Sequence, residues 1–115
     1  MIFKIFQIRL SKEERDQVNL TGHDSVPKQK FKLNLHDRKI SSDYVRNGFN
    51  YFNHVANIIA SDLNDVWVIG NIGVENQIEK FDRMTSLSVG DIIQNESGFQ
   101  FLIQSYGFKN LGLAQ

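Results

Sequence analysis

The order of apolar and polar side chains first predicts a strand over residues 2–10. Apolar residues fall on both faces of this extended segment, so we expect its first half to be covered on both sides. Ser11 and Glu14 then form a capping box, in which each side chain accepts a hydrogen bond from the other residue's backbone amide. A short polar helix to about Asn19 is expected to follow.

The segment from Lys28 to Leu35 alternates between apolar and polar residues. Phe31, Leu33 and Leu35 share one side of an extended chain, and Lys28, Lys30, Lys32 and Asn34 share the other. A period of two favours a half-buried strand. A short helix is the alternative, because alternation over so few residues is compatible with both structures.

A helix and a strand are predicted next. The helix covers residues 43–47, since the polar residues 41–43 offer an N-cap and Gly48 stands where a helix commonly ends. The segment from Tyr51 to Ile59 has apolar residues on both sides and indicates a strand.

Another short helix is expected after this strand. Ser61 or Asp62 caps it, and Gly70 ends it. Beyond it the chain is mostly polar, with Gly73 as a break, and we expect a single helical turn near residues 75–81.

The C-terminal part is typical of a β-hairpin, with strands over residues 88–94 and 99–105 around an Asn95–Gly98 turn. Gly90 supplies a backbone conformation that is costly for other residues, and Asp91 bonds to nearby backbone amides. The whole pattern predicts an α+β fold with a mainly antiparallel, curled sheet, short helices packed on it and a C-terminal β-hairpin. Residues 1–115 are expected to form a single domain.

Composition narrows the function classes. Lysine plus arginine equals aspartate plus glutamate, 13 each, so no overall charge indicates a nucleic-acid or membrane partner. The absence of cysteine excludes disulfides, thiolate metal sites and a cysteine nucleophile. No window has the length of a membrane span, and no secretory signal pattern is present. We therefore expect a cytoplasmic protein that does not bind membranes.

The candidate catalytic residues lack the partners that catalysis needs. A Ser88 nucleophile with Asp91 as its base would require an orienting third group, whereas turn chemistry accounts for both residues. The histidines are His23, His36 and His54, and none has a partner at metal-ligand spacing. An enzyme would need His54 or His23 folded against Asp91 or Asp62. We expect no catalytic residue, no metal and no cofactor.

The lysine stripe at Lys28, Lys30 and Lys32 is the one basic feature that suggests a nucleic-acid contact. Lysines on an edge strand also discourage edge-to-edge aggregation, and in a chain of zero net charge that explanation is favoured. The residues Gly70–Gly73 have the spacing of a GxxG loop that clamps single strands, but no basic residues flank them. Nucleic-acid binding is therefore the alternative hypothesis.

The chain holds nine phenylalanines, three tyrosines and one tryptophan, and most are expected in the core. Tyr106 and Phe108 follow the last predicted strand and are flanked by Gly107 and polar residues. We predict that they anchor a protein partner, because exposed aromatic side chains commonly do so. The alternative, favoured for Phe108, is that it folds back over the sheet.

From Tyr51 onward the chain resembles the YodL-like domain, a small module of bacteria, phages and conjugative elements. The residues that carry the resemblance are Tyr51–Ile59, Ser61–Trp67, Ser86–Ile93 and Ser105–Phe108, so that it extends over residues 51–111. The first half of the chain, with Gly22–Pro27, is similar to small proteins of marine bacteriophages.

This resemblance implies a protein that binds a host protein. Bacterial members of the family look like inhibitors of cell-shape cytoskeletal proteins, and members from mobile elements look like counter-defence modules. It implies no catalytic residue. The sequence therefore predicts a small, non-enzymatic protein-binding module, encoded by a phage or mobile element and acting on a host protein in the host cytoplasm.

Overall fold

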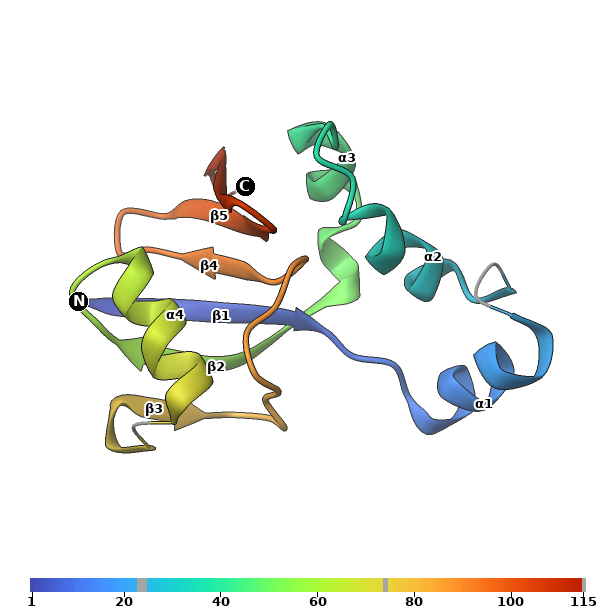
Figure 1. The fold of residues 1–115 in the computed structure, drawn as a ribbon, viewed down its shortest axis with the longest axis horizontal. Helices are drawn as coiled ribbons and strands as arrows, with labels where there is room; N and C mark the ends of the chain where they lie inside the picture. The colour runs from blue at the N-terminus through green and yellow to red at the C-terminus, as the bar shows by residue number, and fades with distance from the viewer. Residues whose placement is uncertain (23–24, 74, 115) are drawn as a thin grey trace. The chain divides into compact units, whose positions relative to one another are not determined.

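A computed structural model describes residues 1–22, 25–73 and 75–114 of the chain (Figure 1). It has an α+β fold, as predicted, built on a six-stranded sheet in the order β3-β2-β1-β4-β5-β6. The strands are β1 Ile2–Ile8, β2 Phe52–Ile59, β3 Ile78–Lys80, β4 Ile92–Gln94, β5 Phe99–Gln104 and β6 Gly107–Leu113. The helices are α1 Lys12–Thr21, α2 Pro27–Asn34, α3 Ser42–Asn47 and α4 Leu63–Ile72, with short 3-10 helices at Phe49–Tyr51 and Glu75–Gln77.

Two compact units make up the chain. The first contains Met1–Gln7 and His54–Gln115, and the second contains Ile8–Asn53. The first unit carries most of the sheet and α4, whereas the second carries α1, α2 and α3 (Figure 1).

Strand β1 lies inside the sheet, between β2 and β4. At its start, the amino group of Met1 donates to the carbonyl oxygen of Ala60 at 3.0 Å, and the amide of Ala60 donates back to Met1 at 2.9 Å. This exchange aligns β1 and β2 antiparallel. The strand predicted over residues 2–10 is therefore confirmed over Ile2–Ile8, and it pairs with segments more than fifty residues away.

Helix α4 covers one face of the sheet in the first unit (Figure 1). Its buried side chains, Val66 and Ile69, belong to one apolar cluster with Phe3 and Ile5 of β1 and Ile58 of β2. Burial of apolar surface of this kind is the main favourable term in folding. The predicted N-cap is also confirmed, because the Asp62 carboxylate accepts a hydrogen bond from the Asp65 amide at 2.8 Å.

The predicted end of α4 at Gly70 is wrong. The helix continues to Ile72, and Gly73 ends it in the left-handed conformation. A Cβ atom on Gly70 would meet the side chain of Leu87 at 2.5 Å, so this glycine allows a close approach inside the helix. The helical turn expected near residues 75–81 is confirmed only at Glu75–Gln77, because the chain then forms the edge strand β3.

The capping box of α1 is present as predicted. The Ser11 hydroxyl accepts from the Glu14 amide at 3.1 Å, and the Glu14 carboxylate accepts from the Ser11 amide at 2.9 Å. The predicted α3 is also present, with the Ser41 hydroxyl accepting from the Tyr44 amide at 3.1 Å. Local side-chain chemistry determines both helix starts.

The strand predicted over Lys28–Leu35 is wrong, because this segment forms the helix α2. Pro27 stands in its first turn, where the missing amide costs nothing. A helical turn also brings Phe31 and Leu35 to one side, and both are buried while Leu33 is 44% exposed. The alternative of a short helix was therefore correct.

Aromatic rings gather around Phe31 in the second unit. Phe31 stacks on Tyr44 with ring centroids 5.1 Å apart and meets Tyr51 at 5.2 Å and Phe52 at 6.2 Å. Gly48 lies against the same ring, and a Cβ atom there would overlap it. Gly48 does end α3, but with φ of −101°, so that packing against Phe31 rather than a left-handed turn requires glycine.

The predicted C-terminal hairpin is confirmed, but its first strand begins at Ile92 and not at residue 88. Strand β4 pairs antiparallel with β5, with Ile92 opposite Leu102 and Gln94 opposite Gln100. The chain then makes a second hairpin that was not predicted, because Ser105 and Tyr106 form a turn into β6. A bulge between Gln100 and Phe101 interrupts the β5–β6 register. Along the described ranges, no helix is both long and apolar enough to cross a membrane.

Candidate functional site

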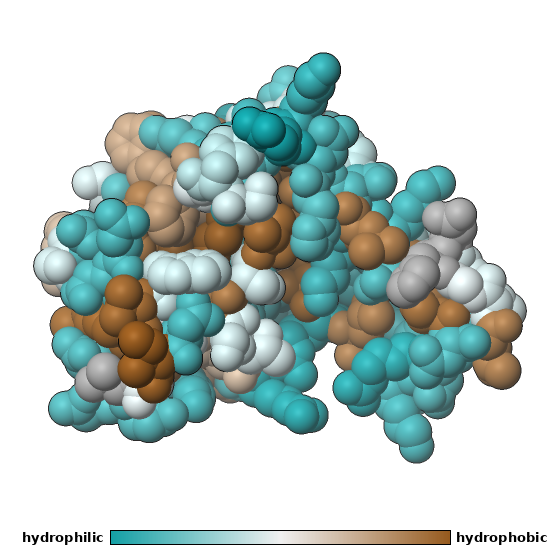
Figure 2. Space-filling model, in the orientation of Figure 1, coloured by the Kyte–Doolittle hydropathy of each residue, from teal (hydrophilic) through white to brown (hydrophobic). Residues whose placement is uncertain are grey.

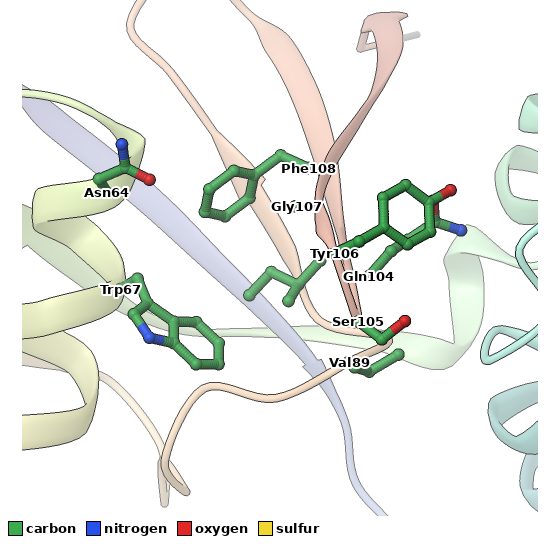
Figure 3. A pocket seen from close by; sticks show the side chains of 9 residues that line it. Asn64, Trp67, Val89, Gln104, Ser105, Tyr106, Gly107 and Phe108 are labelled. Atoms are coloured by element: carbon green, nitrogen blue, oxygen red, sulfur yellow. The ribbon is translucent and has the colours of Figure 1, made fainter.

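A pocket of about 340 Å³ lies between α4 and the β5–β6 hairpin of the first unit (Figure 3). Its lining residues carry no charge, and they are Asn64, Trp67, Val89, Ile103, Gln104, Ser105, Tyr106, Gly107 and Phe108. This volume falls at the small end of ligand pockets in proteins. An uncharged, partly aromatic wall suits an apolar side chain better than an ion.

The packing of α4 explains where the pocket forms. Val66 and Ile69 turn toward the core, so Trp67 falls beside them and remains 40% exposed. Phe108 of β6 is partly buried and packs against the same core from the hairpin side. Figure 3 shows the two aromatic side chains on either side of the pocket, one from α4 and one from β6. The space between them is the pocket.

Both predicted anchor residues line this pocket. Tyr106 lies in the hairpin turn and is 60% exposed, and its hydroxyl donates to Oε1 of Gln104 at 2.9 Å. Phe108 lies on β6 rather than after the last strand, and it packs partly over the sheet. The two residues therefore differ in character, since Tyr106 presents its ring at the surface and Phe108 forms part of the wall.

The sequence did not single out Trp67 or Val89 as site residues. Trp67 follows the buried Val66 by one position, which places it at the edge of the apolar face of α4. That position was the available signal, because a tryptophan at the edge of a buried face is commonly shared between core and surface. Val89 lines the pocket because of the hairpin geometry, and no pattern in the neighbouring sequence indicates this.

Exposed apolar residues continue along α4 beyond the pocket. Val68 is 45% exposed and Ile72 is 76% exposed. Figure 2 shows apolar surface over this helix. The pocket and the exposed residues of α4 therefore belong to the same unit and the same layer of the fold.

Asp91 takes part in a buried hydrogen-bond network. Its carboxylate accepts from the Ser88 amide at 2.9 Å, as the turn chemistry predicts, and from the side chain of Gln7 at 3.0 Å. The same Gln7 side chain exchanges hydrogen bonds with the backbone of Thr85 at 3.0 and 3.1 Å. These hydrogen bonds hold the segment before β4 against β1. No histidine takes part in them.

His54 lies between two aromatic rings. Its ring centroid is 5.1 Å from that of Phe6 and 5.0 Å from that of Phe81. Its Nε2 lies 2.8 Å from Oδ1 of Asn57, a contact whose direction depends on the tautomer. His54 is thus packed as a partly buried aromatic residue and not in contact with Asp91 or Asp62.

The other histidines add no cluster. His36 is exposed, and His23 and Asp24 lie outside the described residues. Within residues 1–22, 25–73 and 75–114, no group of three or more histidine, cysteine, aspartate and glutamate side chains could hold a metal ion.

The lysine stripe does not exist as predicted. On α2, Lys28 and Lys32 are one helical turn apart, and Lys30 points to another side. Lys28 is also engaged, because its ammonium group donates to Glu14 at 2.9 Å and to the Arg9 carbonyl oxygen at 2.9 Å. The GxxG match at Gly70–Gly73 is likewise part of α4 and its cap, not a loop.

Comparisons with family models, with curated proteins and with solved structures find no match for this chain.

Proposed function

We propose that this chain is a small protein-binding module that occupies the surface of a host protein. The observation that carries the proposal is the position of Tyr106. This residue is 60% exposed at the edge of a pocket whose other walls include Trp67 and Phe108. A pocket beside an exposed aromatic ring gives a partner both an anchor to cover and a cavity to fill.

The chemistry of the surrounding residues supports the same proposal. The pocket lining is uncharged, and the exposed Val68 and Ile72 on α4 add apolar surface in the same unit. Interface cores are depleted in charge and enriched in tyrosine, tryptophan and phenylalanine. The catalytic pairings considered for Asp91 and His54 are replaced by structural contacts, which favours binding over catalysis.

The resemblance to the YodL-like domain supports the choice of partner. Three of its segments, Ser61–Trp67, Ser86–Ile93 and Ser105–Phe108, contribute side chains to the pocket. We therefore place the protein in a phage or other mobile element, with its partner in the cytoplasm of a bacterial host. The partner proposed is a host protein, and cytoskeletal proteins that control cell shape are the first class to test.

A pull-down from bacterial lysate tests this function. Tyr106→Ala removes the exposed ring, and we expect it to reduce capture of the partner at least about tenfold, as loss of a binding anchor does. Tyr106→Phe keeps the ring and removes only the hydroxyl that donates to Gln104, so it should retain most of the capture. Leu20→Ala is the second control, because Leu20 is 82% exposed on α1 in the other unit.

Circular dichroism and thermal unfolding should confirm that each variant is folded. If Tyr106→Ala captures the same partner as well as the unchanged protein does, Tyr106 is not an anchor. If no partner is captured and a substrate is turned over instead, the binding function itself is wrong.

A further inference from the structure

The edge of the sheet at β6 presents backbone groups next to the pocket. Strand β6 is the last strand of the described sheet, so its outer side has no neighbouring strand among the described residues. The backbone amide and carbonyl groups that point away from the sheet on such an edge can pair with another chain. The register identifies which residues these are.

Ile103 directs both of its backbone groups toward β4. Its amide donates to the Asp91 carbonyl at 2.9 Å, and its carbonyl accepts from the Gly90 amide at 2.9 Å. Because backbone groups alternate along an antiparallel strand, Gln104 and Leu102 direct theirs toward β6. Their partners in β6 are Gly107 and Lys109.

Phe108 and Asn110 therefore direct their amide and carbonyl groups outward, since they stand opposite Ile103 and Phe101. Beyond them, the Gly112 amide is already engaged, because it donates to Oδ1 of Asn110 at 2.7 Å. The β-bulge opposite Gln100 and Phe101 also bends the strand there. The segment Phe108–Asn110 is the part of this edge that can accept a partner.

Resting on the proposed function, we propose that the β6 edge at Phe108–Asn110 binds an extended segment of the partner protein as an added strand. The residue of that segment opposite Phe108 would place its side chain on the same face of the sheet, beside the Phe108 ring at the edge of the pocket. An apolar or aromatic side chain fits that position, because the pocket lining is uncharged.

Lys109 defines the other side of the added strand. It is the only charged residue from Phe99 to Leu113, and its side chain alternates with those of Phe108 and Asn110. An acidic residue opposite Lys109 would pair with it across the strands. The occupant is thus an extended segment that alternates an apolar residue with an acidic one.

The opposite edge of the sheet lacks this combination. Strand β3 is only three residues long and includes Glu79 and Lys80, and Lys80 forms an ion pair with Glu75 at 3.4 Å. Charges and short length are the features that keep edge strands from pairing. The lone Lys109 also discourages pairing between two copies of β6, since the two like charges would face one another, and it favours an acidic segment instead.

Asn110→Pro tests the edge directly. Proline removes the outward amide of Asn110 and places its ring in the path of an added strand, while the inward bonds of Lys109 remain. Asn110→Ala is the matched control, since it loses the same side-chain contact to Gly112 but keeps the backbone amide. Both variants are compared with the unchanged full chain.

The probe is a surface-displayed library of random peptides of about eight residues, close to the length of ordinary strands. We expect selection on the unchanged protein to enrich peptides with alternating apolar and acidic residues. Their affinity should fall at least about tenfold for Asn110→Pro and stay within about threefold for Asn110→Ala, because only the proline removes a backbone hydrogen bond. Hydrogen exchange of the Phe108 and Asn110 amides should slow when a peptide is bound.

Several results would overturn the proposal. One is a library that yields no alternating peptides. Another is a peptide that binds Asn110→Pro and the unchanged protein with equal affinity. A third is hydrogen exchange of the Phe108 and Asn110 amides that does not change when a peptide is bound. If Asn110→Pro does not fold, the exchange measurement on the unchanged protein decides. A dimer of the unchanged protein that Asn110→Pro abolishes would make a second copy the occupant and would also refute a peptide partner.

The failure of this proposal is distinguishable from failure of the proposed function. A lysate partner that depends on Tyr106 but binds Asn110→Pro normally would support the function and refute the added strand. The peptide measurement does not depend on finding a lysate partner.

Discussion

The side-chain amide of Gln7 donates to the carboxylate of Asp91 at 3.0 Å, across 84 positions of sequence. Gln7 is 2% exposed and Asp91 is 6% exposed, so the contact is shielded from water. Together with the bonds to Thr85 and Ser88, it holds the segment that precedes β4 against the end of β1. The pocket residue Val89 lies in that segment, so this network fixes one wall of the candidate site.

Replacing Gln7 should therefore destabilise the fold. Gln7→Leu removes the donor to Asp91 and both bonds to the Thr85 backbone, and it leaves polar groups in a buried place. We expect a loss of about 1–3 kcal/mol in the free energy of unfolding, the usual cost of stranded buried polar groups. Urea unfolding followed by circular dichroism measures it. The exposed Gln17→Leu is the control and should change stability by less than about 0.5 kcal/mol.

A double-mutant cycle assigns the effect to the contact. Asp91→Ala and Gln7→Leu should show a coupling energy of about 0.5–3 kcal/mol, as contacting residues do. Simple additivity of the two losses would contradict the importance of this hydrogen bond.

The ion pair between Lys28 and Glu14 should make the stability of the fold depend on pH. The hydrogen bond from Lys28 lowers the pKa of Glu14 below its ordinary value of 4.5, and the Ser11 amide lowers it further. A lowered folded-state pKa stabilises the fold fully above the unfolded value, and this stabilisation is lost as the pH falls through the folded value. Lys28→Met should thus raise the pKa of Glu14 toward 4.5, as measured by NMR titration of its carboxyl group.

Above pH 4.5, the free energy of unfolding should be lower for Lys28→Met than for the unchanged protein. This difference should disappear as the pH falls from 4.5 through the folded-state pKa of Glu14. Lys30→Met is the control, because Lys30 is exposed on another side of α2. A Glu14 pKa that is equally low in Lys28→Met would mean that the Ser11 amide alone determines it.

The parts of the fold that local chemistry determines could be predicted from the sequence. The helix caps at Ser11, Ser41 and Asp62 use side chains within a few residues of the amides they bind. The β4–β5 hairpin likewise depends on the turn at Asn95–Gly98. In each case the residues that determine the structure stand next to one another in sequence.

Wrong predictions arose where distant packing determines the structure. Phe31 and Leu35 alternate as strand residues do, but both are buried on one side of a helix, where Phe31 packs against other aromatic rings. Gly70 carries the signal of a helix end, whereas its lack of a side chain accommodates Leu87, which is 17 positions away. No local pattern reveals either contact.

The candidate site was predictable only in part. Tyr106 and Phe108, which the sequence pairs as anchors for a protein partner, line the same pocket. The pocket also needs Trp67, which α4 brings to the hairpin from about forty positions earlier in the chain. The hairpin partner β6 escaped prediction because two glycines, Gly107 and Gly112, interrupt its apolar pattern.

The close approach of Gly48 to Phe31 predicts a cost for the smallest substitution. Gly48→Ala should destabilise the fold by about 1–3 kcal/mol, because its Cβ atom would overlap a ring that is packed among other rings. Thermal unfolding measures the loss, and Asn47→Ala on the exposed side of α3 is the control. Adding Phe31→Leu should make the Gly48→Ala substitution less costly. If the cost is the same with leucine at this position, the ring overlap is not its cause.

DNA binding should be weak, because the lysines of α2 do not form one basic face. We expect generic duplex DNA to bind with a Kd no tighter than about 10⁻⁴ M at physiological salt and to dissociate on modest salt addition. Fluorescence anisotropy with a labelled duplex measures it. A submicromolar complex that resists salt would contradict the prediction and favour the nucleic-acid alternative, and its loss in Lys30→Met would assign it to α2.

Gly90 should be required for the full stability of the hairpin that lines the pocket. Its φ of 97° lies in the left-handed region, which a β-branched residue adopts only with strain. Its amide donates to the Ile103 carbonyl at 2.9 Å, so that a shift of this backbone would also move a pocket residue. Gly90→Val should lower the free energy of unfolding by about 1 kcal/mol or more, measured by urea unfolding. Ser88→Val introduces the same side chain two positions earlier, at an exposed residue without positive φ, and should be nearly neutral. Equal stability of the two variants would show that the conformation of Gly90 is not needed.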